Sequence, residues 1–160
     1  MTNIPRIELD IGYHDSRLPQ DEQRFTQAAR WIADRGGWQR LFASIAIVDD
    51  ATMQQLNSQR LGHDWPTDVI SFVLDGQPGA VEGEVIASAE TAERTSARVG
   101  TTAGDELLLY VVHGLLHVAG LDDITPEQAL AMRRAEQECL RHLGVPSAAE
   151  HLHRWHEIEE

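Results

Sequence analysis

Apolar and charged residues alternate at the start of the chain. Within residues 4–11, Ile7, Leu9 and Ile11 alternate with charged side chains, which is typical of a strand with one buried face. After Pro19, apolar residues recur at helical spacing up to a glycine pair at 36–37, so this stretch is predicted to be an amphipathic helix. An apolar run then predicts a buried strand over residues 41–48.

The rest of the chain predicts two further strands and four helices. Thr125, with Gln128 three residues later, has the pattern of a capping box, in which side chains at the start of a helix bond its free N–H groups. Thr102 and Asp105 have a similar pattern. A turn region at 77–83 separates the two strands. The predicted strands cover residues 69–74 and 84–88, and the predicted helices cover about 50–60, 90–99, 102–120 and 125–143.

This order of elements predicts an α+β fold, with a mixed sheet of about four strands packed with helices in a single domain. We assign residues 1–146 to that domain, since no repeat or long linker divides them. Residues 147–160 form an acidic tail that contains His151, His153 and His156. We interpret this tail as solvated rather than as a metal site.

The composition favours a soluble cytoplasmic protein. A hydrophobic fraction of 42% in 160 residues is sufficient for one core, and the lone Cys139 cannot form an internal disulfide. The start of the chain has no apolar run after a basic segment, so no secretory signal is expected. The most apolar stretch, residues 107–121, contains two histidines and is shorter than the roughly 18 apolar residues of a membrane span.

The net charge of −13 argues against broad, non-specific binding to nucleic acid, because such binding depends on neutralising phosphates. We therefore expect no DNA partner. Thirteen arginines and no lysine supply the positive charge, and a local cleft lined by arginine remains compatible with phosphate binding.

Two histidines on one predicted helix carry the clearest chemistry. His113 and His117 are four residues apart, so they share a helix face and can hold one Zn²⁺. Gly120 lets the chain leave the helix and turn back, so that Asp122 or Asp123 can supply a third ligand. The alternative is a pair of histidines on a half-buried helix with no metal.

Residues 113–123 also resemble the signature of the YbeY family, His-Gly-x-Leu-His-Leu-x-Gly-x-Asp-His. Val118 stands at one leucine position, and Asp123 stands where the family has its third zinc-binding histidine. Upstream, Leu56, Asn57 and Arg60 with the run Pro-Thr-Asp-Val-Ile-Ser-Phe at 66–72 are similar to a second family block. The similarity continues through residues 83–88 to a methionine and a glutamate at 132 and 136.

The resemblance implies a metal-dependent, single-strand-specific endoribonuclease in rRNA maturation and ribosome quality control, with an rRNA precursor and the ribosome or its proteins as partners. It implies a zinc site on His113, His117 and Asp123, and a phosphate-binding Arg60. We assign Arg60 and His113 as catalytic residues. From local sequence alone, Arg60 is equally compatible with a solvated helix end. For Asp122, which a ligand or helix-end role would also suit, we favour orienting a histidine from outside the ligand set.

Two other functions remain open. Zinc peptidases share the His-x-x-x-His spacing, but they carry a glutamate general base directly after the first histidine. Gly114 occupies that position here, which argues against a metallopeptidase-like hydrolase. A non-catalytic ribosome-binding module would need no bound metal, so metal content separates it from the nuclease.

Overall fold

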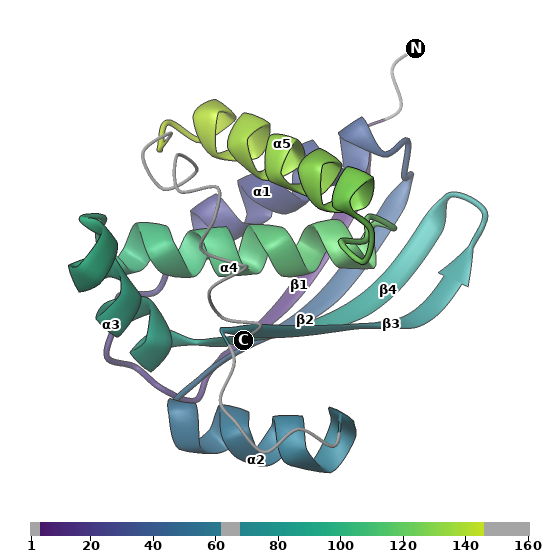
Figure 1. Ribbon diagram of the computed structural model, residues 1–160. Coiled ribbons are helices and arrows are strands. Elements are labelled where there is room, and N and C mark those ends of the chain that lie inside the picture. The colour runs from purple at the N-terminus through teal and green to yellow at the C-terminus, as the bar shows by residue number, and fades with distance from the viewer. Residues whose placement is uncertain (1–3, 62–67, 146–160) are drawn as a thin grey trace.

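The computed structural model describes residues 4–61 and 68–145, with positions 60 and 61 described by their backbone alone. These residues form four strands and five helices, which confirms the predicted α+β class (Figure 1). The strands are β1 (Arg6–Tyr13), β2 (Arg40–Val48), β3 (Val69–Gln77) and β4 (Ala80–Ser88). The helices are α1 (Glu22–Arg35), α2 (Asp50–Leu61), α3 (Ala89–Val99), α4 (Ala103–Val118) and α5 (Pro126–His142).

The sheet is mixed, as the sequence predicted, with the strand order β1-β2-β4-β3. The first three strands in this order are parallel, and β3 runs antiparallel to β4 at the edge. Helices α1, α4 and α5 lie on one face of the sheet, and α2 lies on the opposite face (Figure 1). Helix α1 packs on β1 and β2, α4 packs on β3 and β4, and α5 packs on both of these helices, so that α4 is the central helix of the fold.

The predicted turn region at 77–83 is wrong in extent. Strand β3 continues to Gln77 and β4 begins at Ala80, so the turn contains only Pro78 and Gly79. Gly79 has a φ of +80°, a conformation that favours glycine in a tight hairpin. Residues 80–83, which are only weakly apolar, belong to β4 because this strand is hydrogen-bonded on both sides, to β2 and to β3. Tertiary pairing therefore outweighs their local preference.

Side-chain caps fix the start of the last two helices. Thr125 and Gln128 form the complete predicted capping box. Thr102 caps α4 by accepting from the backbone N–H of Asp105 at 3.1 Å. The carboxylate of Asp105 accepts from Arg24 at 2.8 Å instead, which ties α4 to α1.

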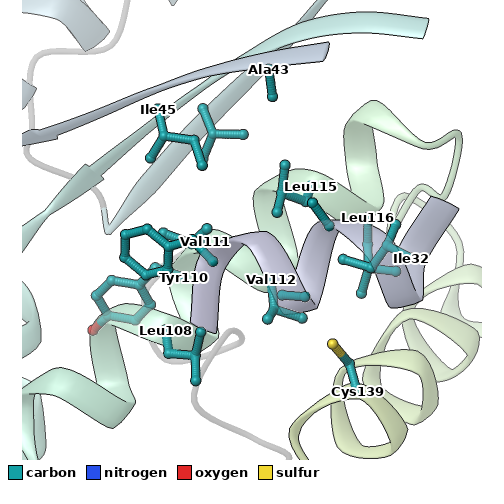
Figure 2. Packing of buried hydrophobic residues seen from close by; sticks show 14 of the residues in the cluster. Ile32, Ala43, Ile45, Leu108, Tyr110, Val111, Val112, Leu115, Leu116 and Cys139 are labelled. Carbon is teal, nitrogen blue, oxygen red and sulfur yellow. The ribbon is translucent and has the colours of Figure 1, made fainter. Parts of the chain in front are cut away.

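The main core surrounds α4 (Figure 2). Leu115 and Leu116 of α4 and Cys139 of α5 are fully buried. Ile32 of α1 and Ile45 of β2 are each 1% exposed. Burying one such side chain stabilises the fold by roughly 1.5–3 kcal/mol.

Glycine allows α4 to approach the sheet closely: a Cβ added at Gly114 would lie 2.6 Å from the Val85 side chain. This contact sets the position of α4, and with it the position of the histidines. Although α4 is strongly apolar, none of the helices in the described part of the chain is long and apolar enough to cross a membrane.

The carboxylate of Asp50 joins the start of α2 to α3. It accepts from Ser88 at 2.6 Å and from Arg94 at 2.7 Å, and it also accepts from Thr91. Burial alone would raise the pKa of Asp50, but these hydrogen bonds outweigh burial and hold its pKa below the ordinary value. A carboxyl group whose pKa is lowered by folding stabilises the protein above its unfolded pKa, and this contribution is lost as the pH falls through the folded pKa.

We therefore expect Asp50→Asn to lower the free energy of unfolding at pH 7 by about 1–3 kcal/mol. The difference from wild type should shrink as the pH falls below about 4, the ordinary pKa of an aspartate, because the unfolded wild-type chain then takes up a proton at this position more readily than the folded protein does. Urea unfolding between pH 3 and pH 7 measures both effects. Asp34→Asn, at an exposed position of α1, is the control and should leave the curve nearly unchanged. A difference that stays constant over this pH range would contradict the role assigned to the Asp50 carboxylate.

Candidate metal centre

His113 and His117 both lie on α4, as predicted from their spacing, and their side chains converge. Their ring centroids are 4.7 Å apart, with an interplanar angle of 78°. His113 is buried, at 6% exposure, whereas His117 is only half-buried. One imidazole is therefore enclosed by the protein, and the other reaches toward solvent.

The loop after α4 brings Asp123 to the two histidines. Gly120 has a φ of +107°, so it provides the predicted reversal of the chain. Trp38 secures the end of α4 by donating from its ring nitrogen to the carbonyl of Ala119 at 3.0 Å. The carboxylate oxygens of Asp123 lie 3.7 Å from Nε2 of His113 and 3.6 Å from Nε2 of His117.

These three side chains fit a metal ion in donor type and spacing. One ligand atom from each lies within 4.8 Å of the others. Bonds of about 2.0–2.2 Å to a tetrahedral Zn²⁺ would separate its ligands by roughly 3.3–3.6 Å, close to the two distances to Asp123. Two imidazoles and one carboxylate also match the three-ligand sets of catalytic zinc sites, which leave a fourth position open. The group of His113, His117 and Asp123 could therefore bind a metal ion.

The histidines and the carboxylate also interact electrostatically. Burial alone would lower the pKa of His117, but the interaction with Asp123, the charge of Asp122 and a hydrogen bond to the backbone of Leu121 raise it above the ordinary value. The interaction with His117 is the largest cause of the lowered pKa of Asp123; burial opposes it, and the charges of His113 and Arg133 add to it. Asp123 is consequently ionised at neutral pH, the form that binds a cation.

A buried carboxylate lies behind His113. Oε2 of Glu136 in α5 is 2.6 Å from Nδ1 of His113, and Glu136 is 3% exposed. Arg133, one turn earlier and 7% exposed, donates to the same Oε2 at 3.3 Å. In the sequence, only the family resemblance pointed to Glu136. Its position in the apolar stripe of α5, beside Met132 and Cys139, was the available signal, because a carboxylate is rarely buried without a partner.

The predicted roles of Asp122 and Arg60 stay predictions. The carboxylate of Asp122 accepts a hydrogen bond from the backbone N–H of Asp123 at 2.9 Å, so it shapes the turn that carries Asp123. Its predicted role in orienting a histidine stays a prediction. Arg60 lies in the last turn of α2, and its side chain lies outside the described residues, as do positions 62–67 of the second family block. The histidines of the predicted tail also lie outside them.

The fold and the site together define a small α+β protein in which two histidines of the central helix and a carboxylate from the following loop could hold a metal ion. The profile of the family described as Endoribonuclease YbeY matches residues 11–144. The chain belongs to this family.

Individual relatives agree with the family profile. A protein of Rhodopirellula baltica named Endoribonuclease YbeY is 46% identical over 140 residues, covering 86% of this chain and 72% of that protein. One of the same name from Thermobifida fusca is 32% identical over 144 residues, covering 84% and 92%. The solution structure of TM1509 from Thermotoga maritima matches with a TM-score of 0.56 at 21% identity, over 86% of this chain and 91% of that one. At this identity the structural match supports the fold alone.

Proposed function

We propose that this protein is a metal-dependent endoribonuclease that cleaves single-stranded RNA during rRNA maturation and ribosome quality control. The observation that carries the proposal is the convergence of His113, His117 and Asp123 on one point. The relatives named Endoribonuclease YbeY support RNA as the substrate. The ribosome or its proteins are the proposed partners, and the cytoplasm is the proposed location.

Zinc is the proposed metal, held by the three side chains of this group. The chemistry that a bound ion supplies is Lewis acidity toward a phosphoryl oxygen. His113 is the proposed catalytic residue among the three, and its burial and its contact with Glu136 support this role. The carboxylate of Asp123 is a harder ligand than an imidazole, so Mn²⁺ is expected to replace zinc more readily than at a site with three histidines.

Arg60 is the proposed phosphate ligand. A guanidinium matches two phosphate oxygens at once. Arg60 lies at the end of α2, and the next element along the chain is β3, the edge strand that contacts α4. In a chain of net charge −13, RNA binding requires such local contacts with arginine.

The structure disfavours a peptidase mechanism. Position 114, where zinc peptidases of this spacing carry a glutamate, packs directly against Val85 and Val69, and even a Cβ there would lie 2.6 Å from the Val85 side chain. No general base fits at that position without displacing α4 from the sheet.

Cleavage of RNA by purified protein tests the proposed function. The wild type with added Zn²⁺ or Mn²⁺ should cut single-stranded RNA but not a duplex of the same sequence, and EDTA should abolish cleavage. Arg60→Ala should reduce cleavage at least about 100-fold, because it removes a phosphate contact, and change stability by less than about 0.5 kcal/mol. Arg134→Ala, at an exposed position of α5, is the matched control. A wild-type protein that binds RNA but never cleaves it would favour the non-catalytic binding module instead.

A further inference from the structure

The contact between Glu136 and His113 joins α5 to the metal centre from behind. At 2.6 Å, it is shorter than either distance from the Asp123 carboxylate to the two histidines, and both residues are at most 6% exposed. Arg133, also buried, donates to the same carboxylate oxygen at 3.3 Å. One oxygen of Glu136 thus contacts both His113 and Arg133, in a region of α4 and α5 where most of the other buried side chains are apolar.

The direction of this hydrogen bond determines which nitrogen of His113 is available to a ligand. An ionised carboxylate can only accept, so Nδ1 of a neutral His113 must carry the proton. The lone pair then lies on Nε2, which is the atom 3.7 Å from the carboxylate of Asp123. In the other tautomer, Nε2 would carry the proton and could not bind a metal.

We propose that Glu136 and Arg133 are positioning residues of the metal centre: Glu136 holds His113 in the Nδ1–H tautomer, and Arg133 holds the Glu136 carboxylate in place. The inference rests on the proposed function in one respect, namely that Nε2 of His113 is the atom that would bind the proposed metal. The contacts themselves involve only side chains of α4 and α5. Partners of this kind orient metal-binding histidines, and their loss commonly weakens metal binding about 10–100-fold.

Nitrogen NMR of the histidine rings tests the proposal without metal or RNA. The sample is the full chain, metal-free and ¹⁵N-labelled, at about pH 8, where an ordinary imidazole is neutral. Wild-type His113 should be the Nδ1–H tautomer. Glu136→Gln should produce a mixture of tautomers, because an amide can donate as well as accept. Its Zn²⁺ affinity, measured by competition with a chelator, should be about 10–100-fold weaker.

Exposed residues of the same helix provide matched controls. Arg133→Gln should shift the His113 tautomer in the same direction as Glu136→Gln but less, whereas Glu138→Gln and Arg134→Gln should leave both tautomer and affinity at wild-type values. A merely structural ion pair between α4 and α5 would change the melting temperature without changing the tautomer.

The wild-type spectrum alone can overturn the proposal, so it remains testable if a variant fails to fold. An Nε2–H tautomer of His113 in the wild type would refute it, and so would Glu136→Gln with an unchanged tautomer and unchanged Zn²⁺ affinity. If the tautomer is as expected but wild-type protein with added Zn²⁺ does not cleave RNA, the proposed function fails while the positioning role stands.

Discussion

Replacing Gly114 by alanine should lower the free energy of unfolding by about 1–3 kcal/mol, and replacing it by glutamate should prevent the native fold. The added Cβ would lie 2.6 Å from one methyl of Val85 and 3.1 Å from the other, with a methyl of Val69 at 3.3 Å. Val85 is fully buried in the central part of the sheet, so it has little room to move. Alanine is the better helix former by about 1 kcal/mol, and the steric cost must exceed this gain.

Urea unfolding of the wild type and Gly114→Ala measures the effect, and Gly104→Ala is the matched control. Gly104 lies on the same helix, but a Cβ there would meet only the end of the Arg24 side chain, at an ordinary distance of 3.6 Å. Gly104→Ala should therefore be neutral or stabilising. If the two substitutions change stability equally, Gly114 is not required for packing α4 on the sheet.

This glycine gives a physical meaning to the second position of the His-Gly signature. The histidines must face the metal centre while the next residue of α4 contacts the sheet. A side chain at 114 would separate α4 from β4 and displace His113 and His117 with it. A nuclease of this kind and a peptidase with a glutamate after its first histidine thus place different demands on the same position.

Much of the fold could be predicted because its signals are local. The helix with His113 and His117, the capping box at Thr125 and the reversal at Gly120 each depend on residues within a few positions of one another. Local patterns could not reveal the strand order, since β2 pairs with β1 and β4 but not with β3, the next strand in sequence. The strand character of residues 80–83 was missed for a related reason, because these residues are held as strand by pairing with β2 and β3 rather than by their own pattern.

Within the candidate site, residues close in sequence could likewise be predicted, whereas residues brought together by helix packing could not. His113, His117 and Asp123 span eleven positions, so spacing and one glycine sufficed to bring them together. Glu136, which Arg133 contacts in turn, reaches His113 only because α5 packs on α4, a contact that the helix periods do not specify. The carboxylate of Asp122 accepts from the next backbone N–H, a local bond that competes with any role at a histidine.

The residue that departs from the family signature should have the largest effect on metal binding. Asp123→Ala should weaken Zn²⁺ binding at least about 100-fold, more than the loss of a residue that only orients a ligand. Its carboxylate oxygens are 3.6–3.7 Å from both imidazole nitrogens, and alanine offers no donor in their place. Asp123→Asn retains the shape but loses the charge, so it should bind Zn²⁺ with an affinity between those of the wild type and Asp123→Ala.

Asp123→His restores the family's third histidine and should bind Zn²⁺ at least as tightly as the wild type. Imidazole suits zinc better than manganese, so the preference for Zn²⁺ over Mn²⁺ should increase. Competition with a chelator for each ion measures all the variants, and Asp122→Ala controls for changes in the loop. The Asp122 carboxylate accepts from the backbone N–H of Asp123, whereas the Asp123 carboxylate itself lies beside both histidines, so the loss of Asp122 should weaken binding less than about tenfold. If Asp123→Ala binds Zn²⁺ as tightly as wild type while Asp122→Ala does not, the third ligand is Asp122, and the turn after Gly120 must rearrange when the metal binds.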